Sequence, residues 1–194
     1  ERLYQEIAAT GKPTEIVRIQ EIGGVSKAIQ RGIDLARKLV IAVSGLQRQA
    51  VDISKVVMAI KCGASDTTSG MASNCVIGYV ADKLVDLGAT VIFGETTEFI
   101  GGEHLLARRA VNGQVAQKIY DIVAAMEQRA KAIGCDMRRG QPTPGNIAGG
   151  LSSIEEKSLG AIMKSGTKPI QGVLDYPQTI TDQKGLWIKD TPGR

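Results

Sequence analysis

Aromatic residues are scarce in this 194-residue sequence, with Trp, Tyr and Phe together making up 4% of the chain. Proteins that bind single-stranded nucleic acid stack bases on such side chains, so this composition argues against that class. The net charge of +4 arises from 24 basic and 20 acidic residues, which are scattered rather than gathered into a basic stripe. We therefore expect no nucleic-acid partner.

Cysteine and long apolar runs are also lacking. The three cysteines, Cys62, Cys75 and Cys135, have no CxxC spacing, so neither a disulfide framework nor a zinc ribbon is indicated. No apolar run reaches the roughly 18 residues that cross a bilayer, and the first residues do not resemble a signal peptide. These features predict a cytoplasmic protein with no membrane partner.

The remaining composition is that of a folded domain. Apolar residues make up 43% of the chain and charged residues 23%, as is usual for globular proteins. The length suits one substantial core, so we expect residues 1–194 to form a single domain. Glycine is abundant, with 23 residues, and clustered glycines allow the backbone to approach a ligand closely.

Apolar patterning predicts an α/β fold. Continuous apolar runs at residues 55–60 and 89–93 are typical of strands buried on both faces, and a helical pattern ending at Gly88 lies between them. Such a βαβ unit makes its strands parallel, so we expect a Rossmann-like parallel sheet flanked by helices. Other patterns predict helices at 26–40 and 112–133, and a third helix that runs from a capping box at Ser152 or Ser153 to Met163. Strands are predicted at 169–174 and 186–188, and a loop at 134–150.

Two loops are the candidates for chemistry, because ligands of open α/β sheets bind beyond the carboxyl ends of the strands. The first loop, residues 61–70, brings the Cys62 thiol, the Asp66 carboxylate and several hydroxyls. The second, residues 94–104, brings carboxylates and the one histidine of the chain, His104. If the strands are neighbours, this set suits a divalent metal with mixed O, N and S ligands, and leaves a carboxylate or imidazole to remove a proton.

Each of these residues also has a structural interpretation. Cys62 can fill a small space in the core, and Asp66 can bond backbone amides within its own turn. Glu98 can be a solvated charge, and His104 a structural histidine or part of a helix start. Arg109, one of a basic pair that follows the second loop, can form a surface salt bridge.

The glycine-rich segment 144–150 precedes a capped helix, so its amides are placed to hold an anion. It matches neither GxGxxG after a strand nor a P-loop, which argues against nucleotide binding.

Four motifs follow one another along the chain. They are Ile19-Gln20 through Gly23-Gly24, Cys62-Gly63-x-Ser65-Asp66 through Gly70 and Asn74, Glu95-x-x-Glu98 with His104, and Gly145-Asn146-x-x-Gly149-Gly150 through Glu156 to Gly160. In this order they resemble the altronate and galactarate dehydratase family, which includes the large subunit of sulfolactate sulfo-lyase. The resemblance covers residues 16–193, and within it residues 66–70, 94–98 and 141–150 are most similar to the sulfolactate branch.

The resemblance implies β-elimination from a 2-hydroxy acid, with iron(II) as the divalent metal. A base removes the proton beside the carboxylate, a group leaves the next carbon, and the enol becomes a 2-keto acid. Water leaves from altronate or galactarate, and sulfite from sulfolactate. The candidate residues are Cys62, Glu95 and His104 for the metal, Asp66, Glu98 and His104 for acid–base catalysis, and Ser65, Ser69, Asn74, Arg109 and Asn146 for substrate binding.

Two departures from the family pattern also carry expectations. Cys75 stands where the family usually has proline, so no function is transferred to it. Family members extend beyond both ends of the matching region, which predicts a piece of a longer chain that works as a homo-oligomer or with a partner subunit or domain. The alternative to an enzyme is a non-catalytic scaffold or interaction domain whose chemistry is completed by other segments.

Overall fold

The computed structural model describes residues 1–191; Pro192 and Gly193, the end of the region of family resemblance, lie outside the described residues. The chain divides into two compact units, Glu1–Ala50 and Val51–Arg194, and each is described by itself. All strands of the described residues lie in the second unit. The expectation of a single domain over residues 1–194 stays a prediction.

The first unit contains two helices, α1 (Arg2–Ala8) and α2 (Val25–Ser44). Gly24 precedes α2 with φ 111°, a backbone conformation that favours glycine. The helix predicted at residues 26–40 is therefore confirmed, and it continues for one further turn.

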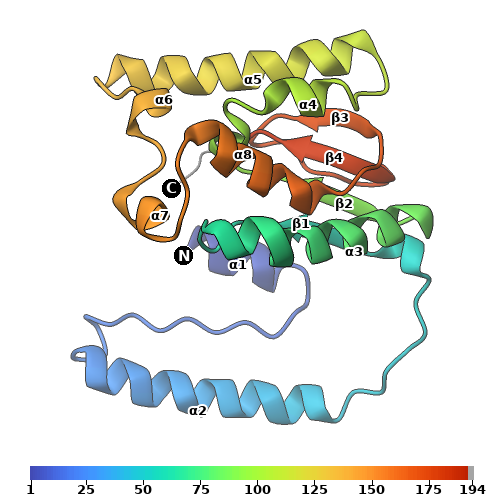
Figure 1. Cartoon of the computed structure of the whole chain (residues 1–194). Coiled ribbons are helices and arrows are strands. Elements are labelled where there is room, and N and C mark those ends of the chain that lie inside the picture. The colour runs from blue at the N-terminus through green and yellow to red at the C-terminus, as the bar shows by residue number, and fades with distance from the viewer. Residues whose placement is uncertain (192–194) are drawn as a thin grey trace. The chain divides into compact units, whose positions relative to one another are not determined.

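The second unit is built on a four-stranded parallel sheet (Figure 1). Its strands are β1 (Val57–Ile60), β2 (Thr90–Phe93), β3 (Ile170–Leu174) and β4 (Gly185–Lys189), in the spatial order β1-β2-β4-β3. The register pairs Ile60 with Phe93 and Phe93 with Ile188, so β1, β2 and β4 end side by side. The predicted α/β fold with a parallel sheet flanked by helices is confirmed.

Two long helices cover the sheet. Helix α3 (Asn74–Asp86) packs on β2 and β4, whereas α5 (Gly113–Ala132) packs on β3. Figure 1 shows them on opposite sides of the sheet. Side chains of both strands and helices are fully buried between these layers, and they form one core: Val91, Phe93, Phe99, Ile100, Leu106, Ile119, Ile170 and Ile188.

The segment 134–150, predicted to be a loop, contains two short helices, α6 (Met137–Gly140) and α7 (Pro144–Ala148). Asp136 caps α6, and a Thr143–Asn146 capping box begins α7. These helices are too short to show an apolar period, so their caps were the only sequence signal.

The remaining elements are short, apart from α8 (Ile154–Ile162), which begins at the predicted cap Ser153. No described helix is long and apolar enough to cross a membrane. The short elements are η1 (Ile53–Lys55), η2 (Ser69–Ser73), η3 (Thr96–Phe99), α4 (Glu103–Ala107) and η4 (Met163–Ser165).

Candidate active site

The loops after β1 and β2 meet at the carboxyl edge of the sheet. The carboxylate of Glu95, which follows β2, accepts a hydrogen bond from the backbone N–H of Cys62, which follows β1, with N···Oε2 2.5 Å. Its other oxygen accepts from Lys61 Nζ at 2.7 Å. The parallel pairing of β1 and β2 therefore joins the two loops in one site, as the sequence predicted.

The backbone at Glu95 is unusual, since its φ is 64°. A non-glycine residue rarely adopts this left-handed conformation, which costs roughly 1–3 kcal/mol and must be held by its surroundings. Here the Glu95 N–H donates to Thr191 Oγ1, beyond β4, at 2.5 Å. The turn directs the chain into η3, where Glu98 becomes buried.

Cys62, Glu95 and Glu98 form a cluster that can hold a metal ion. One ligand atom from each lies within 4.8 Å of the others, and both carboxylates are buried. A thiol with two carboxylates offers one soft and two hard donors, a set that suits Fe²⁺ or Zn²⁺ better than Mg²⁺ or Ca²⁺. The residues present therefore fit the divalent metal that the sequence predicted.

The surroundings shift the pKa of the Cys62 thiol and the pKa of the Glu95 carboxylate in opposite directions. Burial raises the pKa of the Cys62 thiol, and the Glu98 carboxylate raises it further, while the Ser65 hydroxyl opposes them. Burial also acts to raise the pKa of Glu95, but hydrogen bonds from Lys61 and the Cys62 amide outweigh it and hold that pKa below the usual value. A cation at the cluster would favour the thiolate over the thiol.

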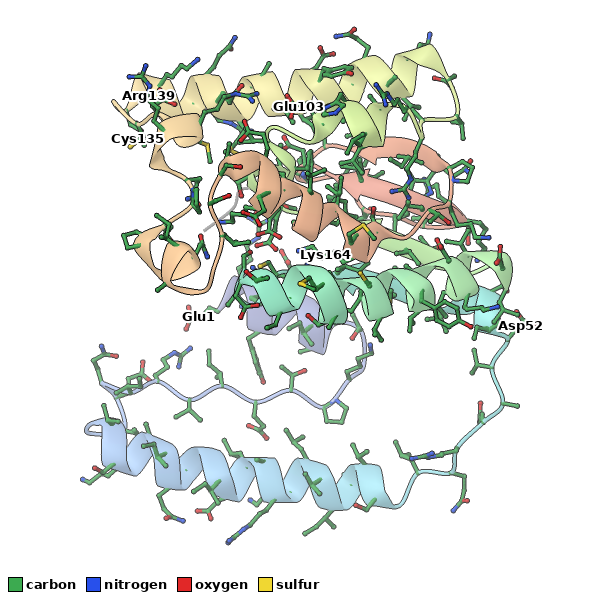
Figure 2. The ribbon with its side chains drawn as sticks, viewed as in Figure 1. Glu1, Asp52, Glu103, Cys135, Arg139 and Lys164 are labelled. Atoms are coloured by element: carbon green, nitrogen blue, oxygen red, sulfur yellow. The ribbon has the colours of Figure 1, made fainter. Side chains whose placement is uncertain are left out.

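Glu98 is held by a buried ion pair. Its Oε2 accepts a hydrogen bond from Lys164 Nζ, and the two side chains are only 8% and 3% exposed. Figure 2 labels Lys164, which lies in η4, the short helix that directly follows α8. Its ammonium also lies 5.7 Å from the centre of the Phe93 ring, close enough for a cation–π contact.

One cavity contains this cluster, and a second, larger cavity lies next to the first. The first, of about 210 Å³, is lined by all three cluster residues and by side chains of the loop 61–65, α6, α7 and α8. The second, of about 400 Å³, is lined by α8 and by the segment 65–75, which runs from the first loop through η2 into α3. Ser65 and Lys157 line both cavities and therefore mark their common boundary.

Asn146 and Lys157 tie α7 and α8 to the first loop. Asn146 Nδ2 donates to the Ser65 carbonyl at 2.8 Å, and Asn146 Oδ1 accepts from Lys157 Nζ at 3.1 Å. Lys157 Nζ also donates to Gln141 Oε1 at 2.8 Å. The α7 helix, which lies in the segment predicted to be a loop, is therefore part of the site.

Three other predicted site residues line the larger cavity, namely Asp66 and Ser69 of the first loop and Asn74, the first residue of α3. Asp66 Oδ1 accepts from the Ser69 N–H at 2.6 Å and from the Thr68 hydroxyl at 2.8 Å. Hydrogen bonds from Ser69 and Thr68 hold the pKa of Asp66 below its usual value. The backbone-bonding role considered for Asp66 is thus present in the structure. Asn74 Nδ2 donates to the Gly160 carbonyl at 2.8 Å, which links α3 to α8.

His104 and Arg109 lie away from the cluster. His104 is exposed on α4 and lines neither cavity. The Arg109 guanidinium donates to Ser165 Oγ at 2.9 Å and to the carbonyls of Ser165 and Lys168, so it supports the turn before β3 rather than the site. Cys62 therefore lies together with Glu95 and Glu98, and His104 is not part of this cluster.

Three lysines of the site were missing from the sequence-based set: Lys61, Lys157 and Lys164. Lys61 had a detectable signal, since it directly follows a predicted strand. Lys157 and Lys164 come from the α8 region, and Lys164 is 66 positions from its partner Glu98 in the chain. Their position depends on how α8 packs against the sheet, which has no local sequence signal.

Together these features define an α/β domain with a candidate metal and carboxylate site at the carboxyl edge of its sheet. The model of the family described as D-galactarate/Altronate dehydratase, C-terminal, matches residues 53–194. The chain belongs to this family, as its motifs predicted.

Individual relatives support the same assignment. The chain is 44% identical to the (2R)-sulfolactate sulfo-lyase subunit beta of Chromohalobacter salexigens, over 98% of this chain and 49% of the relative. It is 36% identical to the galactarate dehydratase (L-threo-forming) of Escherichia coli, over 87% of this chain and 32% of the relative. It is 33% identical to the altronate dehydratase of Bacillus subtilis, over 91% of this chain and 35% of the relative. The chain thus spans a third to a half of the length of these relatives.

Proposed function

We propose that the Cys62–Glu95–Glu98 cavity belongs to the active site of a metal-dependent lyase that acts on 2-hydroxy acids. The observation that carries this proposal is the convergence of one thiol and two buried carboxylates within 4.8 Å at the carboxyl edge of the sheet. Relatives named as a sulfo-lyase and as dehydratases support elimination chemistry. The cofactor we propose is Fe²⁺, because the cluster offers both a soft and hard donors.

In this proposal Cys62, Glu95 and Glu98 hold the metal. When bound, the ion supplies positive charge that polarises a carboxylate and its neighbouring hydroxyl. Lys61 and the Cys62 amide orient Glu95, and Lys164 orients Glu98. The exposed position of His104 removes it from the ligand set that we propose.

The reaction is a β-elimination. A base takes the proton from the carbon that carries the hydroxyl and the carboxylate, and that electron pair forms a double bond to the next carbon. The leaving group departs from this second carbon with its bonding electrons, and the enol then becomes a 2-keto acid. We assign the base role to Asp66, because hydrogen bonds keep this carboxylate ionised and it directly follows Ser65, which lies at the boundary of the two cavities.

The test has a metal arm and a product arm. Co²⁺ added to the purified protein should give the near-ultraviolet band of a thiolate–metal bond, and Cys62→Ser should abolish it. Cys75→Ser is the matched control, because Cys75 lies in the larger cavity outside the cluster. Iron-loaded protein incubated anaerobically with altronate, galactarate or sulfolactate should yield a 2-keto acid.

A Co²⁺ band that survives in Cys62→Ser would refute the metal site. Metal uptake without a keto acid from any of the three substrates would refute the proposed reaction.

A further inference from the structure

Two of the three lysines around the two cavities in the described residues are paired with a carboxylate, and Lys157 is not. Lys61 pairs with Glu95 and Lys164 with Glu98. In the larger cavity, backbone and hydroxyl groups of Ser69 and Thr68 bind Asp66. The Glu156 carboxylate, also in that lining, accepts from the N–H and hydroxyl of Ser152.

Lys157 is the exception. Within residues 1–191 no carboxylate lies within 4.0 Å of its ammonium group, although the residue is half-buried. Its two acceptors, Gln141 Oε1 and Asn146 Oδ1, are neutral amide oxygens. An ammonium group has three N–H donors, so one donor and the whole positive charge are left for another partner.

The side chain is also held in place. Asn146 Oδ1 accepts from the Thr143 N–H at 3.1 Å and from the Thr143 hydroxyl at 2.9 Å, while its Nδ2 is bound to the Ser65 carbonyl. This fixes the orientation of the amide that receives Lys157. A lysine whose side chain is already held in one orientation loses less conformational entropy on binding an anion than a mobile surface lysine does.

We propose that Lys157 is the residue that binds the anionic group at the far end of the substrate, and that it selects 2-hydroxy acids carrying a second negative charge. This inference rests on the proposed function. The first carboxylate and hydroxyl face the Cys62–Glu95–Glu98 cluster in the smaller cavity, and the second anion, a carboxylate or a sulfonate, reaches Lys157 at the boundary with the larger one.

The decisive ligands are malate and its 4-amide, which have the same shape and differ in the charge of the far group. Neither carries a group that the proposed elimination would expel from the third carbon, so binding can be measured at equilibrium by calorimetry in the metal-loaded protein. We expect the wild-type protein to bind malate at least about tenfold more tightly than the amide. Lys157→Met should reduce this preference to less than about twofold, and Lys157→Arg should keep most of it.

Controls separate charge recognition from loop damage. Lys131→Met removes an exposed lysine of α5 that lines neither cavity, and it should leave the preference unchanged.

A preference for malate that persists in Lys157→Met would overturn the inference, as would an equal loss of affinity for both ligands. In those cases Co²⁺ binding through Cys62 would be intact, whereas failure of the proposed function would appear as loss of that metal signal or of keto-acid formation.

Discussion

The carboxylate of Glu95 binds the backbone amide of Cys62, with N···Oε2 2.5 Å, and so connects the ends of β2 and β1. The two residues are 33 positions apart in the chain. Because parallel neighbours place equivalent ends at one edge, this contact brings the thiol and the carboxylates together. The metal site that we propose depends on this contact and on the burial of Glu98 one turn later.

We predict that Glu98, and not His104, contributes to metal affinity. Glu98→Gln should weaken Co²⁺ binding by at least about tenfold, because loss of an outer contact to a metal ligand already has an effect of that size. His104→Ala should change the affinity by less than about twofold, since His104 is exposed and lines neither cavity. Calorimetric titration of both variants checks this, and the reverse order of effects would restore the histidine to the ligand set.

The buried Lys164–Glu98 pair should stabilise the fold only as a pair. Lys164→Met leaves an unpaired buried carboxylate, and we expect the free energy of unfolding to fall by about 3 kcal/mol at pH 7. The double variant Lys164→Met/Glu98→Leu should regain most of this loss, because no unpaired charge remains. Urea denaturation in the presence of a chelator measures the free energy of unfolding of both variants.

The matched control for that pair is Lys61→Met, which breaks the pair with Glu95. Lys61 has a 60% exposed side chain, so water screens the interaction and the expected loss is about 1 kcal/mol or less. If Lys164→Met cost no more than Lys61→Met, the buried pair would have no special role in stability.

Gly78 on α3 should not tolerate a side chain. A Cβ there would lie 2.2 Å from the carbonyl oxygen of Met163, so α3 would have to move away from η4, which carries Lys164. We expect Gly78→Ala to lower the free energy of unfolding by about 2 kcal/mol or more. The control is Gly113→Ala at the start of α5, where the added Cβ meets no atom within 4 Å. We expect it to change the free energy of unfolding by no more than about 0.5 kcal/mol. Equal shifts of the thermal unfolding midpoint for the two variants would contradict the packing described.

Asp66 should give the stability of the protein a pH dependence. Hydrogen bonds from Ser69 and Thr68 lower its pKa in the folded state, so its ionised form stabilises the fold above the ordinary carboxyl pKa. That stability is lost as the pH falls through the lowered value. Asp66→Asn should therefore be less stable than the wild type at neutral pH, and the difference should shrink on acidification. Denaturation midpoints at several pH values measure it; a constant difference would mean that ionisation of Asp66 contributes nothing.

The sequence determined the elements of the α/β fold and the two loops that carry the site. Buried strands, the helix that ends at Gly88 and the cap at Ser153 have local causes, namely apolar runs, helical periodicity and hydrogen bonds over three residues. The motifs were also enough to identify the family.

Tertiary structure decided which side chains of those loops meet. Glu98 and His104 belong to the same loop, and residue type made the histidine the stronger metal candidate. The left-handed turn at Glu95 and the η3 helix bury Glu98, whereas α4 exposes His104. Lys157 and Lys164 enter the site because α8 packs against these loops, and contacts between residues so distant in the chain leave no local pattern in the sequence.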